Sequence, residues 1–329
     1  MQKLRIAIVG LGKMGILHSS ILHTMPNVEV VALCDKSFFL RKFVSKMFKK
    51  AQVVNDLMEL DNSNLDSIYV TTPIPVHFPI IKTIYMNKMA RNVFVEKTLA
   101  ASYEQSKELC SLANDSGGVN MVGYMKRFAV SFQKAKEILA QGTLGEIKSF
   151  EAFAYSSDFF DIGKKSKKPA ARGGVLRDLG SHVIDLSLFL FGDFEVTSAI
   201  LESLTEENSE DSANVRVKNS TLEGQFTFSW SKEDYRMPYF GIDVMGNKGK
   251  MRVTDETLEL TRAGKVKKWF KHDLDDHVGF LLGEPEYYRE DEIFITTSIT
   301  ESEAEPSFLA ASKTDYLIDQ IKMKAIKNA

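Results

Sequence analysis

The stretch IAIVGLGKMGILHS, residues 6–19, contains glycines at positions 10, 12 and 15, which match the pattern G-x-G-x-x-G. In this pattern the glycines provide a tight turn, a close backbone approach and a close contact between helix and strand. Residues 4–9 read as a buried strand, 13–25 carry helical apolar spacing, and a second strand is expected over 28–34. Asp35 follows that strand, 20 residues after Gly15, where a carboxylate meets the ribose hydroxyls of a dinucleotide. This order of strand, glycine turn, helix, strand and acidic residue predicts a dinucleotide-binding turn. The alternative is a glycine-rich turn that binds nothing.

The length and composition indicate a two-domain globular protein. A chain of 329 residues exceeds what one core usually supports. Lys and Arg total 42 against 44 Asp and Glu, and the formal charge of −2 argues against a nucleic-acid partner. Two cysteines are too few for a disulfide framework, and no apolar run has the length of a signal or membrane segment. We therefore expect a cytoplasmic protein with no membrane partner.

The first third of the chain alternates strands and helices, which predicts a parallel sheet with helices on both faces. After the first two strands we expect strands over 67–71, 92–95 and 119–122, and helices over 77–87 and 102–114. Ligands of such sheets bind beyond the carboxyl ends of the strands. The residues expected to face one crevice are therefore Asp35, Thr71, Thr72, Glu96, Lys97 and Gly123.

The alternation stops after Gly123, where we place the boundary between a dinucleotide-binding domain, 1–123, and a substrate-binding and oligomerisation domain, 124–329. The second domain is expected to be α+β, with a large, mostly antiparallel open sheet. Helices are expected over 128–140 and 307–327, and strands over 146–155, 194–203, 212–218, 221–230, 239–245, 249–260 and 265–271. The acidic stretch 202–211 is expected to form a solvated hairpin tip.

The stretch GGVLRDLGSHVIDLSLFLF, residues 173–191, is expected to be a helix with one apolar stripe. On an α-helix, Asp178 and His182 lie one turn apart beside that stripe. A histidine beside a carboxylate is suited to general acid/base chemistry near neutral pH, and the alternative is an ion pair that stabilises the helix. A metal site that includes Asp185 is disfavoured, because no further histidine or cysteine cluster accompanies it, and we expect no metal.

The chain resembles the Gfo/Idh/MocA family of NAD(P)-dependent oxidoreductases, whose members pair a Rossmann domain with a larger open-sheet domain. The resemblance rests on GLGKMGILHS at 10–19, FVEKTLA at 94–100 and GGVLRDLGSHVIDL at 173–186. It is supported by TTPIPVH at 71–77 and GYMKRF at 123–128. The similarity covers most of the first 190 residues, and the last third resembles the family only as a strand-rich domain.

The resemblance implies catalytic roles for Lys97, Asp178 and His182. It implies hydride transfer between the nicotinamide and a carbinol carbon, with His182 accepting the hydroxyl proton, Lys97 holding the same oxygen and Asp178 orienting His182. Arg127 is a further candidate for contact with the substrate. The family commonly has proline after the lysine, whereas this chain has Thr98. We expect that difference to alter the local backbone around Lys97.

The expected cofactor is NAD rather than NADP, since the charge of Asp35 would repel a 2′-phosphate, although Lys36 would partly offset that repulsion. The expected cofactor-binding residues are Gly10, Gly12, Lys13, Met14, Gly15, Asp35, Thr71, Thr72, Pro73, His77, Glu96 and Lys97.

We expect a small-molecule substrate of the sugar, cyclitol or polyol type and an assembly into homodimers or homotetramers. The basic cluster Lys164, Lys165, Lys167 and Lys168 is either a contact for an anionic substrate or a solvated loop. Two alternatives to a simple dehydrogenase remain open. One is a family member that uses bound NAD for transient oxidation during glycoside cleavage or epimerisation, and the other is a non-catalytic dinucleotide-sensing or scaffold protein.

Overall fold

The computed structural model describes residues 3–60, 64–163, 165–204, 209–279 and 283–326. The chain divides into two compact units. The first unit comprises Met1–Tyr124 and Tyr287–Ser312, and the second comprises Met125–Glu286 and Lys313–Ala329. Within the described part of the chain, no helix is both long enough and apolar enough to cross a bilayer.

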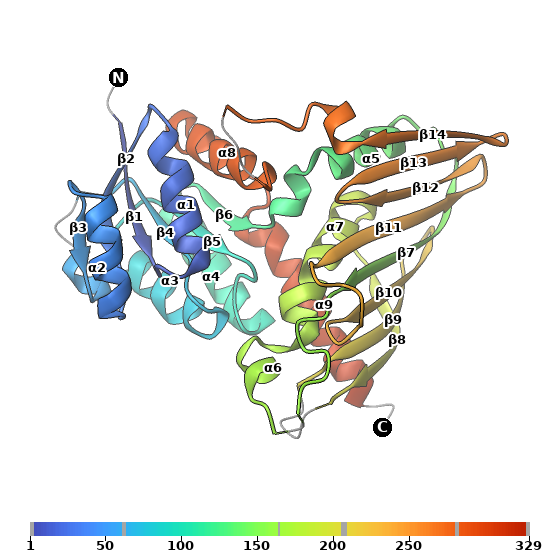
Figure 1. Ribbon diagram of the computed structural model, residues 1–329, viewed down its shortest axis with the longest axis horizontal. Coiled ribbons are helices and arrows are strands. Elements are labelled where there is room, and N and C mark those ends of the chain that lie inside the picture. The colour runs from blue at the N-terminus through green and yellow to red at the C-terminus, as the bar shows by residue number, and fades with distance from the viewer. Residues whose placement is uncertain (1–2, 61–63, 164, 205–208, 280–282, 327–329) are drawn as a thin grey trace. The chain divides into compact units, whose positions relative to one another are not determined.

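The first unit contains a six-stranded parallel sheet in the order β3-β2-β1-β4-β5-β6 (Figure 1). This is the strand order of dinucleotide-binding folds, and it places a switch point between β1 and β4, where ligands bind beyond the strand ends. The expected parallel sheet is confirmed. The strands are β1 (Leu4–Val9), β2 (Val28–Cys34), β3 (Gln52–Val54), β4 (Ser67–Val70), β5 (Asn92–Glu96) and β6 (Asn120–Gly123).

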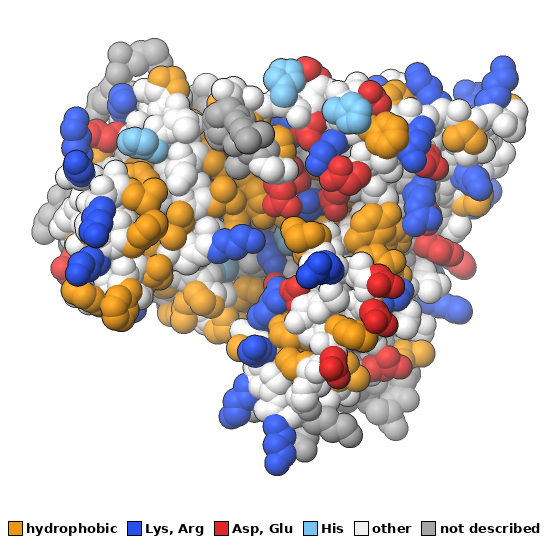
Figure 2. Space-filling view, in the orientation of Figure 1, with side chains coloured by type: hydrophobic (Ala, Val, Ile, Leu, Met, Phe, Trp, Pro, Cys, Tyr) orange, Lys and Arg blue, Asp and Glu red, His pale blue; other side chains and the backbone are white. Residues whose placement is uncertain are grey.

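The helices of the first unit include two that the sequence analysis did not predict, α2 and α8. In α2 only Val44 is buried, while Phe38, Phe39 and Phe43 are exposed, so its apolar residues do not form one core-facing stripe. Figure 2 shows hydrophobic and basic side chains together on the surface at that helix. The helices are α1 (Lys13–Thr24), α2 (Phe38–Met47), α3 (His77–Met86), α4 (Tyr103–Ser116) and α8 (Glu286–Thr300), which begins at the last residue of the second unit.

The helix α8 packs on the sheet of the first unit although it comes late in the chain. The Phe294 ring lies 5.3 Å from the ring of Tyr69 in β4 and 5.6 Å from that of Phe94 in β5. All three side chains are fully buried. Because β4 and β5 are central strands, α8 brings polar residues of the chain's last quarter close to the middle of the sheet.

The second unit contains an eight-stranded sheet in the order β14-β13-β12-β11-β7-β10-β9-β8 (Figure 1). Only the pair β7 and β10 is parallel, so the expected mostly antiparallel sheet is confirmed. The expected single strand over 249–260 is wrong, because a turn at Asp255 and Glu256 divides it in two. The strands are β7 (Ile147–Tyr155), β8 (Glu195–Glu202), β9 (Ser212–Lys218), β10 (Glu223–Ser229), β11 (Tyr239–Gly246), β12 (Gly249–Thr254), β13 (Thr257–Arg262) and β14 (Lys265–Phe270).

One face of this sheet carries the core of the second unit. Alternate strand residues such as Phe226, Phe228 and Ile242 are fully buried there, as the strand period of two requires. The helices that complete the core are α5 (Val130–Ala140), α7 (Ser181–Phe191) and the second half of α9 (Phe308–Ile326), and a short helix α6 (Lys168–Ala171) precedes α7.

The segment expected to be one helix over 173–191 begins differently. Leu176–Gly180 forms a π-helical turn, and α7 follows directly from Ser181. Gly180 lies against the Phe228 ring, which a Cβ atom would approach to 2.9 Å. Asp178 therefore does not stand at the α-helical spacing from His182 that the sequence predicts, since π-turns have more residues per turn than α-helices.

The acidic stretch 202–211 was expected to be a solvated hairpin tip, and its last part is not. Glu210 and Asp211 are buried, at 5% and 1% exposure. Asp211 accepts a hydrogen bond from the indole nitrogen of Trp230 at 2.8 Å, and Glu210 accepts one from the backbone nitrogen of Leu176 at 3.4 Å. These carboxylates therefore serve as internal acceptors. Residues 205–208 of the stretch lie outside the described residues.

Candidate active site

The glycine-rich turn between β1 and α1 has the geometry that the sequence pattern predicts. Gly10 adopts φ +96°, and a Cβ atom there would come within 2.7 Å of the Thr72 side chain. A Cβ atom on Gly15 would overlap the carbonyl oxygen of Gly10, while one on Gly12 would meet nothing within 4 Å. Gly12 also caps α1 without a side-chain hydrogen bond. A turn with open space at its middle glycine and a helix N-terminus behind it fits a dinucleotide pyrophosphate.

The carboxylate of Asp35 lies between this turn and the start of α2. One oxygen accepts a hydrogen bond from the backbone nitrogen of Leu11 at 2.6 Å, and the other accepts one from the backbone nitrogen of Ser37 at 2.6 Å. The neighbouring Lys36 is exposed and forms an ion pair with Asp56 at 2.9 Å. The hydrogen bond to Asp56 raises the pKa of Lys36. The cation next to Asp35 therefore has a carboxylate partner of its own.

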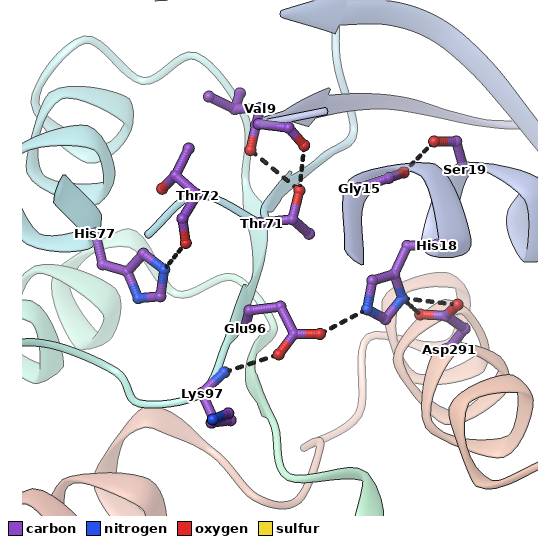
Figure 3. Close-up of polar contacts among 11 residues, drawn as sticks. Val9, Gly15, His18, Ser19, Thr71, Thr72, His77, Glu96, Lys97 and Asp291 are labelled. Atoms are coloured by element: carbon purple, nitrogen blue, oxygen red, sulfur yellow. Dashed lines mark hydrogen bonds and ion pairs between the residues drawn. The ribbon is translucent and has the colours of Figure 1, made fainter. Parts of the chain in front are cut away.

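The loop after β4 is tied to the glycine turn and, through His77, to the loop after β5. Figure 3 shows the contacts of Thr71 and that of His77 with Thr72. The hydroxyl of Thr71 donates to the carbonyl oxygen of Gly10 at 2.6 Å. His77 is fully buried, and its ring nitrogens contact the carbonyl oxygens of Thr72, at 2.7 Å, and Thr98, at 2.8 Å. Burial lowers the pKa of His77. His77 therefore joins two loops, in addition to its predicted contact with the cofactor.

Glu96 and Lys97 stand at the carboxyl end of β5. One oxygen of Glu96 contacts His18 at 2.9 Å, and the other accepts a hydrogen bond from the backbone nitrogen of Lys97 at 3.2 Å (Figure 3). The Lys97–Thr98 peptide bond is cis. Of the remaining predicted contacts in this unit, Lys13 is exposed and Met14 is half-buried at the start of α1, and Pro73 precedes a short 3-10 turn.

In the second unit, His182 and Asp178 occupy consecutive turns of one helical segment. His182 is buried on α7, and its ring lies edge-on to that of Phe240, with 5.3 Å between centroids. Asp178 lies in the π-helical turn and forms an ion pair with Arg172. A second nitrogen of Arg172 pairs with Asp158 at 2.7 Å. Arg172 therefore supplies a positive charge beside the predicted orienting carboxylate, a partner that the sequence analysis did not identify.

Two cations in the segment GYMKRF are buried in the second unit. Arg127 makes a two-pronged ion pair with Asp185, at 2.6 and 2.7 Å, which engages part of the guanidinium predicted to contact substrate. Lys126, which the sequence analysis did not single out, pairs with Asp255 at 2.9 Å and Glu286 at 3.0 Å. Burial alone disfavours its charge, but these carboxylates outweigh burial and raise the pKa of Lys126. Its ammonium also lies 5.3 Å from the centre of the Phe240 ring that His182 contacts.

The remaining candidates are the basic cluster and Asp185. Lys165, Lys167 and Lys168 are exposed, and Lys164 lies outside the described residues. Asp185, the third member of the disfavoured metal cluster, is paired with Arg127. Among the residues that the structure describes, no group of three His, Cys, Asp or Glu side chains could hold a metal ion.

The fold and the glycine turn define the first unit as a dinucleotide-binding domain of the Rossmann class. Residues 4–124 match the profile of an oxidoreductase family with an NAD-binding Rossmann fold, and residues 132–252 match the Gfo/Idh/MocA C-terminal domain. The chain belongs to the Gfo/Idh/MocA oxidoreductase family.

Three relatives illustrate what the chain is similar to. It is 30% identical over 207 residues to an uncharacterised oxidoreductase of Schizosaccharomyces pombe, covering 62% of this chain and 56% of the relative. It is 24% identical over 278 residues to levoglucosan dehydrogenase of Pseudarthrobacter phenanthrenivorans, covering 80% and 65%. It is 26% identical over 192 residues to an NADP⁺-dependent scyllo-inositol 2-dehydrogenase of Bacillus subtilis, covering 57% and 52%. The matches thus span between about half and two thirds of these relatives.

The fold also matches a solved structure over its whole length. A levoglucosan dehydrogenase in complex with NADH and levoglucosan superposes with a TM-score of 0.90 at 19% identity, covering 100% of this chain and 98% of the other. At this identity the match shows a shared fold.

Proposed function

We propose that this protein is an NAD-dependent dehydrogenase or reductase that acts on a hydroxyl or carbonyl group of a sugar, cyclitol or related polyol. The observation that carries the proposal is the single sheet edge on which the turn after β1, the loop after β4 and Lys97 after β5 all lie. Family membership supports the activity, and two relatives are named for an anhydrosugar and a cyclitol substrate.

The residues of the chain divide into cofactor binding and proton handling. The turn Gly10–Gly15 would hold the pyrophosphate, and Asp35 would bind the adenine ribose, with its charge favouring NAD over NADP. When bound, the nicotinamide cofactor supplies the hydride acceptor or donor. Lys97 would hold the substrate oxygen, because a fixed ammonium stabilises negative charge as it develops there.

We assign His182 as the group that takes the hydroxyl proton during oxidation and returns it during reduction. Asp178 would orient the imidazole and favour its charged form. Its pairing with Arg172 supports this role, because a carboxylate fixed by an arginine has a defined direction. The π-helical turn that carries Asp178 is consistent with a functional position, as such turns often occur at functional sites.

The experiment is to mix the protein with NAD and a panel of sugars and cyclitols and to follow the absorbance of the reduced nicotinamide. A dehydrogenase produces reduced cofactor in proportion to substrate. An enzyme that uses transient oxidation changes the sugar with no net cofactor reduction, which product analysis detects. Binding of NAD with neither change in any member of the panel would favour a dinucleotide sensor.

We also infer a cytoplasmic homo-oligomer joined through the second unit. The core lies on one face of the eight-stranded sheet. The opposite face carries large apolar side chains that are exposed in the single chain, among them Ile200, Met245 and Val266. Burying such a face against a second copy is the simplest symmetric arrangement.

A further inference from the structure

His18 lies between two carboxylates in the interior of the first unit. Its ring is fully buried on α1, with Nε2 2.9 Å from Glu96 of β5 and Nδ1 2.8 Å from Asp291 of α8 (Figure 3). Carboxylate oxygens accept hydrogen bonds and do not donate them. With Asp291 and Glu96 ionised, both ring nitrogens donate and the ring is positively charged. Burial raises the pKa of Asp291, and the charge and hydrogen bond of His18 oppose that rise.

The other groups around His18 are consistent with this charge. The rings of Tyr69, Phe94 and Tyr287 lie 5.7, 5.2 and 6.0 Å from it. Burial alone disfavours a charged imidazole, but the carboxylates of Asp291 and Glu96 outweigh burial and raise the pKa of His18 well above its usual value. Burial and the charges of Asp291 and Glu290 also raise the pKa of the Tyr69 hydroxyl, which stays neutral.

Glu96 connects this buried charge to Lys97. One carboxylate oxygen of Glu96 is held by His18, and the other accepts the hydrogen bond from the backbone nitrogen of Lys97. On the other side of Lys97, the carbonyl oxygen of Thr98 contacts the buried ring of His77. Two buried histidines thus hold the backbone on either side of the predicted catalytic lysine, His18 through Glu96 at the Lys97 nitrogen and His77 at the Thr98 carbonyl oxygen.

We propose that His18 is a positioning residue for Lys97, acting through Glu96. The charged ring fixes the rotamer of Glu96, and Glu96 fixes the direction of the Lys97 peptide. This proposal rests on the proposed function, in which Lys97 holds the substrate oxygen.

Stability alone is a poor explanation for this arrangement. Replacing buried ion pairs by apolar side chains of similar volume is often neutral or stabilising, since desolvation of the charges is costly. Here the carboxylate of Asp291 comes from α8, 273 residues from His18 in the chain, and contacts His18. His18 in turn contacts Glu96, whose second oxygen accepts the hydrogen bond from the backbone nitrogen of Lys97. A role in holding Lys97 in place would explain why these charges are buried here.

The test measures His18→Asn in the wild-type background and in a Lys97→Ala background. If His18 acts through Lys97, we expect His18→Asn to lower kcat about 10- to 100-fold in the first background, since small misplacements of reacting groups have effects of this size. In the Lys97→Ala background we expect His18→Asn to lower kcat less than about 3-fold, because the effects of substitutions at residues that act as one unit are not additive. Cofactor affinity should change little in either.

A control and a second variant guard against misfolding. His23→Asn makes the same exchange on the same helix at an exposed residue that packs on Phe48, and it should leave kcat unchanged. Glu96→Gln keeps the size of the side chain while removing its charge, and it should reproduce the loss of kcat and its dependence on Lys97. Nuclear magnetic resonance of the wild-type imidazoles supplies a readout without mutation: the His18 ring should stay charged between about pH 6 and 8, where an ordinary histidine titrates.

The outcomes separate the two proposals. If the wild-type protein transfers no hydride to or from any member of the panel, the proposed function fails whatever His18 does. If Lys97→Ala keeps full activity, the role assigned to Lys97 is wrong, and the positioning role of His18 is wrong with it. If Lys97→Ala loses activity but His18→Asn has equal effects in both backgrounds, the positioning role is wrong and the proposed function stands. A His18 ring that loses its charge near pH 6.5 would likewise overturn the positioning role.

Discussion

At the scale of single residues, the charges of Asp35, Lys36 and Asp56 lead to a prediction for the cofactor preference. Asp35 is held by backbone hydrogen bonds, so its carboxylate is fixed, while Lys36 is paired with Asp56. A 2′-phosphate at this position meets a fixed negative charge and a cation that already has a partner. We expect kcat/KM to favour NAD over NADP.

Substitutions of Asp35 and of Asp56, the partner of Lys36, test this preference for NAD. Asp35→Ser should reduce the preference for NAD, and Asp56→Asn should do so more weakly by releasing Lys36 toward a phosphate. The ratio of kcat/KM for the two cofactors measures both effects. A wild-type preference of tenfold or more for NADP would contradict the role of Asp35.

The proposed proton path makes His182 and Lys97 the residues on which turnover depends. His182→Ala should lower kcat about 10²-fold or more, with NAD affinity nearly unchanged, because the glycine turn belongs to the other unit. Lys97→Ala should also lose turnover, and Lys97→Arg should not restore it, since a planar guanidinium does not replace a compact ammonium. Steady-state kinetics and cofactor titration measure the two quantities. Near wild-type turnover in His182→Ala would make Lys97 the leading candidate for the base.

Asp178 should act on the pH dependence more than on the maximal rate. Asp178→Asn keeps the shape of the side chain but removes the negative charge that favours a charged imidazole at His182. The acidic limb of the pH–rate profile should therefore move to lower pH. Arg172→Gln is the matched comparison, since it removes the positive partner of Asp178 and should move the limb the other way. If the acidic limb moves in neither variant, Asp178 does not orient His182, and its ion pair with Arg172 has a structural role.

The sequence predicts those site residues that belong to a local pattern. The glycine turn, Asp35, Lys97 and His182 were all named from short motifs. The partners of His18 could not be found this way, because Asp291 is 273 residues distant and lies on a polar helix with no recognisable motif. The pairing of Arg172 with Asp178 was missed because it depends on a turn that is not α-helical.

At the scale of elements, the start of the segment that carries Asp178 depends on a glycine. Gly174 adopts φ +86°, and a Cβ atom there would overlap the buried carboxylate of Glu210. Gly174→Ala should therefore destabilise the fold by about 1–3 kcal/mol, the usual range for overpacking a filled site. Chemical denaturation measures the free energy of unfolding. The control is Gly163→Ala, which meets nothing within 4 Å and should be close to neutral, and equal effects in the two variants would contradict the argument.

The strands β1, β2 and β9 were located to the residue, because each carries a run or alternation of apolar residues. The helix α8 was missed because it is rich in polar residues, whereas α2 was missed although its apolar residues follow a helical spacing. The turn that divides β12 from β13 was missed although the apolar positions change parity across it, from Met251 and Val253 to Leu258 and Leu260.

At the scale of the whole molecule, the two faces of the sheet in the second unit differ in whether helices pack on them. One face is packed by α5, α7 and α9 around fully buried aromatic residues such as Phe226. On the other face Phe153, Tyr155 and Tyr239 form an aromatic group, with Phe153 and Tyr155 5.4 Å apart and Phe153 and Tyr239 5.5 Å apart. Aromatic side chains of this kind are enriched at protein interfaces.

The exposed apolar residues on this face lead us to predict that the protein forms an oligomer through it. The chain has a mass of 37.0 kDa, and we expect light scattering at micromolar concentration to give a dimer or tetramer rather than that monomer mass. Met245 and Val266 line one hollow on the face and are 50% and 64% exposed, so Met245→Glu with Val266→Glu should produce monomers without unfolding the chain. The matched control is Met86→Glu on α3 of the first unit, where a methionine that is 67% exposed should tolerate the charge with no change in assembly. A wild-type protein that scatters as a monomer would refute the assembly, and an oligomer that persists in the double variant would place the interface elsewhere.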